Sequence, residues 1–172
     1  MVRRFLNIII LVLLIIFQVS FINNLVFPFS QLNLILSFLI FLIMTADIYL
    51  TLKIALALGF LLEFYSAVNF GFILISIFLT LILLYLLFIN FFTNKSFYSL
   101  MILGLIGSVA YYFIFILINK LFYFFNLNFF EYSFEPVSLI WSAGLNLVIL
   151  TIFFFGYNFL THELKSYFIY GK

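Results

Sequence analysis

The sequence predicts an all-α integral membrane protein, a compact bundle of about six transmembrane helices that forms one domain over residues 1–172. Three observations predict this fold class. Hydrophobic residues make up 69% of the chain and charged residues only 7%, whereas about one quarter of a soluble protein is charged. Long apolar runs alternate with short polar breaks. The few Lys and Arg residues are also distributed as expected for a single orientation of the helices in a membrane.

The first predicted span, residues 5–22, follows Arg3 and Arg4 and continues without a break to Asn23. A helix needs roughly 20 residues to cross the hydrocarbon core, because it rises about 1.5 Å per residue through about 30 Å. The apolar run is longer than that of a typical secretory signal peptide, and no small-x-small cleavage site follows it. We therefore expect an uncleaved transmembrane helix.

The second and third predicted spans, residues 32–44 and 48–64, are short and are divided by a polar break at 45–47. Two arrangements stay open: a tilted hairpin that stops short of one membrane face, or a second helix that extends past Asp47. Asp47 is expected to be the N-cap of the third span, because its carboxylate can accept hydrogen bonds from first-turn N–H groups. Lys53 is expected to reach the cytoplasm.

The last three predicted spans are residues 70–92, 97–118 and 137–160. Polar breaks at 65–69 and 93–96 define the first of them. A longer polar segment, 119–136, follows the span at 97–118 and is expected to be the longest external loop. No soluble domain is predicted on either side of the membrane.

The cations predict that both termini are cytoplasmic. Loops on the cytoplasmic side carry an excess of Lys and Arg. Six spans that start inside leave only Lys120 on the outer side and place six cations inside: Arg3, Arg4, Lys53, Lys95, Lys165 and Lys172.

Several classes of chemistry lack the residues that they need. The chain has no cysteine and one histidine, so we predict no metal site and no cofactor. His162 and Glu163 do not complete a zinc-protease HExxH motif, because Ser166 stands where the second histidine is needed. Asp47 and Glu63 are expected on opposite membrane faces and cannot act as a catalytic pair. We predict no catalytic residue, no enzyme activity and no nucleic-acid binding, since the cations do not cluster.

Glu63 is the main candidate site residue, at the predicted outer end of the third span with Gly59 one turn before it. Its carboxylate can cap the short loop or the start of the next helix, where a negative charge meets the helix dipole. Alternatively, it is a buried acceptor that organises the helix hairpin and a partner surface. Gln18 and Asn146, within the first and last spans, are predicted to hydrogen-bond across to other helices.

Small residues four apart are predicted to lie where helices pack closely, because short side chains let backbones approach in a membrane. Gly104 and Ser108 form such a pair in the fifth span, and Ser138 and Ser142 form another in the sixth.

Three stretches, around Gln18, at residues 59–71 and at residues 139–146, together resemble the MreD family of rod-shape-determining proteins. Gln18 is similar to a glutamine that closes the first span, and residues 139–146 resemble the start of the last helix. Residues 59–71 resemble the family signature of glycine, three apolar residues, aspartate and a second glycine. Glu63 replaces the aspartate, and Ala67 stands where a glycine is common.

The resemblance implies a non-enzymatic membrane component of the bacterial cell-elongation machinery, located in the plasma membrane. Such a protein would contact an MreC-like membrane protein and link cytoskeletal filaments inside to peptidoglycan synthesis outside. Gly59, Glu63 and Gly71 would form a helix-hairpin signature and a candidate partner contact. No small-molecule substrate is expected.

The same resemblance also implies an alternative, since the family fold is similar to the substrate-binding S component of energy-coupling-factor vitamin transporters. A vitamin site needs several convergent hydrogen-bonding groups. The polar residues expected on the outer side, which could converge in this way, are Asn23, Asn24, Gln31, Glu63, Asn69, Glu131 and Glu135.

Overall fold

The computed structural model describes residues 2–66, 70–92, 96–125 and 135–170, and within them the side chains of residues 9–161. The described chain is helical and contains no β-strand, which confirms the predicted all-α class. Its elements are α1 (Val2–Ile16), the π-helical turn η1 (Phe17–Phe21), the 3₁₀ turns η2 (Ile22–Asn24) and η3 (Phe29–Gln31), α2 (Leu34–Thr45), α3 (Ile48–Glu63), α4 (Phe72–Phe91), α5 (Phe97–Phe124) and α6 (Pro136–Tyr170).

The helices lie on the six predicted segments but differ at several ends. α5 continues past the expected end at Ile118 to Phe124, and α6 continues past Leu160 to Tyr170. The first segment changes from α-helix to a π-helical turn at Phe17. A helix that extends past Asp47 is excluded, because Ala46 and Asp47 have extended backbones and separate α2 from α3.

Side-chain caps begin two of these helices. The Asn33 side chain accepts a hydrogen bond from the Leu36 N–H at 2.9 Å and starts α2. Ser96 accepts one from the Ser99 N–H at 3.2 Å and starts α5. Asp47 occupies the N-cap position of α3 as expected, but its carboxylate makes no capping hydrogen bond. The expected capping interaction of Asp47 is therefore absent.

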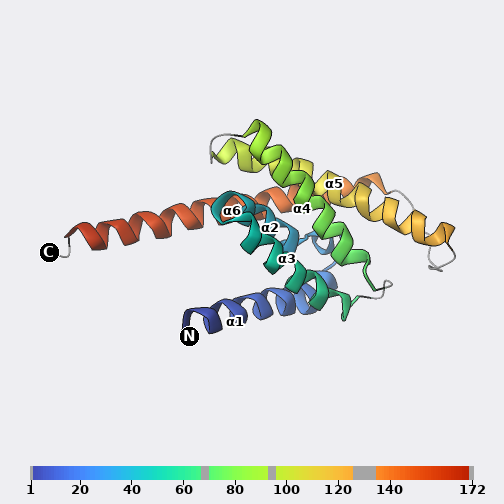
Figure 1. The fold of residues 1–172 in the computed structure, drawn as a ribbon, viewed down its shortest axis with the longest axis horizontal. Coiled ribbons are helices and arrows are strands. Elements are labelled where there is room, and N and C mark those ends of the chain that lie inside the picture. The colour runs from blue at the N-terminus through green and yellow to red at the C-terminus, as the bar shows by residue number, and fades with distance from the viewer. Residues whose placement is uncertain (1, 67–69, 93–95, 126–134, 171–172) are drawn as a thin grey trace.

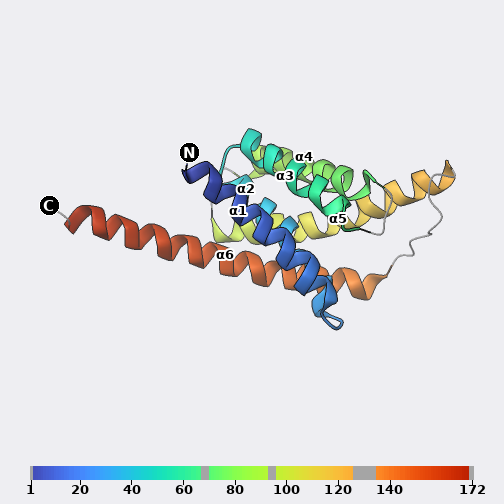
Figure 2. The same cartoon turned by 90° about the horizontal axis from the view of Figure 1, so that it is seen from below.

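α2 lies at the centre of the molecule, and α3, α4, α5 and α6 contact it (Figure 1). α1 crosses the bundle on one side, and the start of α1 and the end of α6 point to the same end of the molecule (Figure 2). The side chains on the central face of α2 are buried. The core residues that are at most 1% exposed include Ile35, Leu36, Leu39 and Ile40 of α2, Leu58 of α3, Leu81 and Leu84 of α4, Leu100 and Leu103 of α5, and Leu150 of α6.

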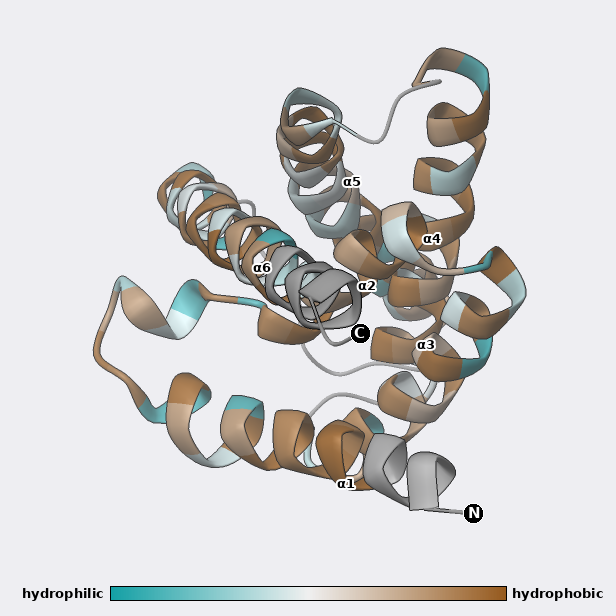
Figure 3. Ribbon diagram, turned by 90° about the vertical axis from the view of Figure 1, so that its left-hand side faces the viewer, coloured by the Kyte–Doolittle hydropathy of each residue, from teal (hydrophilic) through white to brown (hydrophobic). Residues whose placement is uncertain are grey.

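The outside of the bundle is also apolar. Large hydrophobic side chains are exposed on every helix whose surface is described except α2, for example Leu13 at 58% and Ile152 at 58%. Hydrophobic colours predominate along the described helices in Figure 3. Within the described residues, three helices are long and apolar enough to cross a membrane: Phe72–Phe91, Phe97–Phe124 and Pro136–Thr161. These are the features of a membrane protein.

Candidate functional site

The Glu63 carboxylate joins the end of α3 to the start of α4. One of its oxygens accepts a hydrogen bond from the Gly71 N–H at 2.7 Å, and the other accepts one from the Leu74 N–H at 2.8 Å. The side chain is only 5% exposed. Backbone N–H groups at a helix start have no partner within the helix and favour a negative charge. Glu63 therefore caps α4 and is at the same time a buried acceptor within the hairpin.

Two glycines make this arrangement feasible. Gly71 has φ of +101°, a left-handed conformation that side chains disfavour. At Gly59, a Cβ atom would lie 3.3 Å from Cα of Leu74, so the backbones of α3 and α4 approach closely there. The spacing of Gly59, Glu63 and Gly71 in the sequence thus corresponds to one structural unit, the α3–α4 hairpin.

Three phenylalanines form an exposed aromatic cluster on the outside of this hairpin. Phe60, Phe64 and Phe70 contact one another with ring centroids 5.0–6.2 Å apart, all in edge-to-face geometry. They are 46%, 64% and 61% exposed. Because Glu63 itself is buried, the hairpin presents aromatic rings and not its carboxylate to the surroundings.

The side chains of Gln18 and Asn146 both bind backbone N–H groups at the start of α2. Gln18 accepts a hydrogen bond from the Leu34 N–H at 2.8 Å, and Asn146 accepts one from the adjacent Asn33 N–H at 2.9 Å. Asn146 also donates to the Ser108 hydroxyl of α5 at 3.0 Å. Both side chains are buried, Asn146 completely. Residues from the first and last helical segments therefore hold neighbouring amides at one helix start.

Of the two pairs of small residues, Gly104 lies at a close helix contact, whereas Ser108, Ser138 and Ser142 border a cavity. A Cβ atom at Gly104 would clash with Leu150, so α5 and α6 are in close contact there. Ser138 and Ser142, the other predicted packing pair, line the polar cavity described next, and Ser138 donates to the carboxylate of Glu135 at 2.8 Å. Their small side chains leave space at this point of the bundle.

A polar cavity of about 340 Å³ lies where α1 ends and α2 begins, beside α5 and the start of α6. Its volume is at the low end of the range of about 300–1,000 Å³ for small-ligand pockets. Three lining residues are apolar: Leu32, Leu62 and Ile73. The ten polar lining residues are Gln18, Asn23, Ser30, Gln31, Asn33, Ser108, Tyr111, Tyr112, Ser138 and Ser142. None of these side chains carries a charge at neutral pH.

Sequence reasoning identified only part of this cavity. Asn23 and Gln31 were among the outer polar residues that could converge, and both line it. Glu135 lies at its edge, since the Glu135 N–H donates to the Tyr112 hydroxyl at 2.7 Å. Asn24 does not join them and donates to the backbone carbonyls of Val19 and Ser20. Asn69 and Glu131 lie outside the described residues.

Asn33, Tyr111 and Tyr112 are cavity residues that sequence reasoning missed. The only available signal is the density of amide and hydroxyl side chains in residues 23–33.

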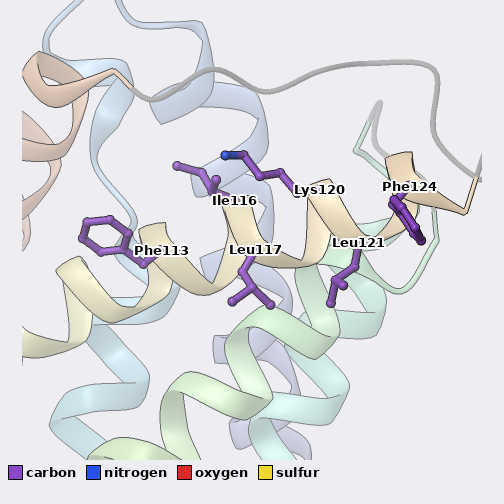
Figure 4. Close-up of a pocket in the computed structure, with 6 residues that line it drawn as sticks. All are labelled: Phe113, Ile116, Leu117, Lys120, Leu121 and Phe124. Atoms are coloured by element: carbon purple, nitrogen blue, oxygen red, sulfur yellow. The ribbon is translucent and has the colours of Figure 1, made fainter.

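A second hollow lies on the outer surface of α5, where six of its residues line a shallow apolar face: Phe113, Ile116, Leu117, Lys120, Leu121 and Phe124. Lys120 points to one side of the helix, and Leu117 and Leu121 point to the other (Figure 4). One helix provides all six residues, so this face is a groove along α5 and is not enclosed.

Within the part of the chain that the structure describes, no three His, Cys, Asp or Glu side chains gather where they could hold a metal ion. Comparison of the sequence with protein-family models and with curated proteins finds no match, and comparison of the fold with solved structures finds none either.

Proposed function

We propose that this chain is a non-enzymatic integral membrane component of the bacterial cell-elongation machinery, acting through protein contacts. One observation carries the proposal. Gln18, Glu63 and Asn146, the polar residues at the centre of the three stretches that resemble the MreD family, are all buried and all accept hydrogen bonds from the first N–H groups of α2 or α4. The residues that carry the resemblance are thus the polar residues that set the arrangement of the helices.

The proposed location is the bacterial plasma membrane, with both termini in the cytoplasm. Six consecutive helices with the start of α1 and the end of α6 at one end of the molecule suit this orientation. The distribution of Lys and Arg favours the same orientation. α2 and α3 have 12 and 16 residues and would cross only part of the hydrocarbon core, enclosed by the longer helices.

The aromatic cluster of Phe60, Phe64 and Phe70 is the surface that we assign to an MreC-like membrane partner. Aromatic side chains are enriched where proteins meet, since they provide a large and rigid contact area. The cluster lies at the hairpin end opposite Lys53, so in the proposed orientation it would lie near the outer membrane surface. A partner with a single span and an external domain could contact it there.

Depletion of the protein from a rod-shaped host should turn the cells round, and the wild-type chain should restore their shape. A variant with Phe60, Phe64 and Phe70 all changed to Ala should fold but retain about tenfold less of the MreC-like partner on co-purification, because truncating a central aromatic typically costs above about 1 kcal/mol. Phe91→Ala is the matched control, since Phe91 is 74% exposed at the other end of α4. Rod-shaped depleted cells would refute the proposed function.

The polar cavity favours a second candidate function, that of the substrate-binding S component of an energy-coupling-factor type transporter. Ten of its lining residues offer hydrogen-bonding groups, as a small-molecule site requires. In that case the purified chain should retain a small ligand in native mass spectrometry and should co-purify with ATPase subunits. Normal uptake of every vitamin in depleted cells would refute this second candidate.

A further inference from the structure

The polar cavity has a composition that selects its ligand class. All of its polar groups are amides and hydroxyls, and no lining side chain is charged. An anionic ligand would lose its hydration without meeting an opposite charge on any lining side chain, which is costly. The nearest acid at the edge, Glu135, would in addition repel an anion. The cavity therefore suits a neutral ligand with many hydroxyl or amide groups.

Several lining groups are free to bind such a ligand. Ser30, Gln31 and Ser142 make no side-chain hydrogen bond to any other residue that the structure describes. These three side chains come from η3 and α6, which contact each other beside the cavity. Serine hydroxyls and a glutamine amide can both donate and accept, so they match hydroxyl groups of either orientation.

Other lining groups are held in place and provide shape. Tyr112 is fixed because its hydroxyl donates to the Glu135 carbonyl at 3.0 Å and accepts from the Glu135 N–H at 2.7 Å. Tyr111 packs against Phe115 with ring centroids 6.1 Å apart. Gln18 is held by its bonds to Asn23 and to the backbone of residues 32 and 34. The cavity thus combines a rigid frame with aromatic rings and a few free polar groups.

We propose that this cavity binds a neutral glycosyl group. A sugar ring has hydroxyl groups around its edge and C–H groups on its faces, so it matches free amide and hydroxyl groups beside tyrosine rings. The glycosyl group has two sources, the headgroup of a membrane glycolipid or a free sugar. The inference stands on the cavity alone and does not depend on the role in cell elongation.

The single tryptophan of the chain provides the measurement. Trp141 precedes the lining residue Ser142, is 45% exposed and contacts Phe27 edge-on at 6.5 Å. Its fluorescence should change when the cavity is filled. The full chain would be placed in phosphatidylcholine nanodiscs with increasing monoglucosyl, monogalactosyl or N-acetylglucosaminyl diacylglycerol. The soluble arm would titrate the methyl glycosides of the same three sugars.

We expect a saturable change with at least one glycosyl probe and none with phosphatidylglycerol. A response to the glycolipid alone identifies a lipid headgroup as the source, whereas a response to the methyl glycoside identifies a free sugar. Ser142→Leu, which fills the cavity, and Gln31→Ala, which removes one free amide, should each weaken binding about tenfold. Gly144→Leu is the matched control on α6, because its new side chain would meet no atom within 4 Å of Cβ.

The proposal is overturned if none of the glycosyl probes gives a saturable change. It is also overturned if phosphatidylglycerol gives the same response, or if Ser142→Leu and Gln31→Ala both fold and bind as tightly as the wild type. The shape of depleted cells is independent of these results, so failure here and failure of the elongation proposal can be told apart.

Discussion

Glu63→Ala is predicted to destabilise the fold itself, because the carboxylate is the acceptor for two N–H groups at the start of α4. A hydrogen bond to a charged group contributes about 1.5–3 kcal/mol. Gly71 and Leu74 are half-buried, so water can compensate part of the loss. We therefore expect a loss of about 3 kcal/mol, at the lower end of the sum for two such bonds.

The predicted loss can be measured as a thermal shift of the purified chain in detergent. A free-energy change of 1 kcal/mol moves the melting temperature of a chain of this size by roughly 2–4 °C. Glu63→Ala should therefore melt about 6–12 °C below the wild type. Glu63→Gln should lose about half as much, because its amide oxygen keeps one N–H partner while its NH₂ group faces the other.

Asp47→Ala is the matched control for this experiment. Asp47 is also an acid next to a helix start, yet it is exposed and its carboxylate makes no capping hydrogen bond. Its removal should cost less than about 1 kcal/mol, the usual size of a helix-dipole interaction at an exposed site. Equal shifts for Glu63→Ala and Asp47→Ala would refute the argument that the two hydrogen bonds of Glu63 hold the hairpin together.

Three further predictions concern other parts of the bundle, and the same melting assay checks each of them. Gly71→Ala should cost about 1–2 kcal/mol, because alanine disfavours a positive φ; an unchanged melting temperature would contradict this backbone conformation. Gly104→Leu should cost about 1–3 kcal/mol through its clash with Leu150, whereas Gly144→Leu should be neutral. Asn146→Leu should cost about 2 kcal/mol, because it removes hydrogen bonds to two partners. Adding Ser108→Ala to this variant should then cost little more. If the free-energy losses of the two substitutions were fully additive, the hydrogen bond between Asn146 and Ser108 would contribute nothing to stability.

The helices of this chain could be predicted from its sequence because their ends coincide with polar breaks. At the end of α5, where polar residues lie inside the helix, the predicted boundary was wrong. Asn119 and Lys120 were interpreted as the start of a loop, but α5 continues through both, and Asn119 is only 1% exposed. In a sequence with so few polar residues, an amide side chain that is buried within a helix cannot be distinguished from one in a loop. The π-helical turn at Phe17–Phe21 has no marker in residue type at all.

Likewise, one part of the candidate site could be predicted from the sequence and another part could not. The α3–α4 hairpin could be predicted because its parts are close in sequence and their spacing follows helix geometry. The full polar cavity could not, because its walls come from four separate parts of the chain: residues 18–33, Leu62 with Ile73, residues 108–112 and residues 138–142. Only the packing of α5 and α6 around α2 brings these segments together. Ser138 and Ser142 show why the sequence alone does not predict the cavity, since a small residue can bring two helices together or leave room between them.

The shortness of α2 has a consequence for how the protein is made. Its 12 residues measure about 18 Å, little more than half of a hydrocarbon core about 30 Å thick. α2 therefore has too few apolar residues to settle in a bilayer as an independent span. The helices that enclose it most, α5 and α6, leave the ribosome later than α2 does. A nascent chain cut short after α4 should consequently be degraded by membrane quality control and should not persist as a stable fragment.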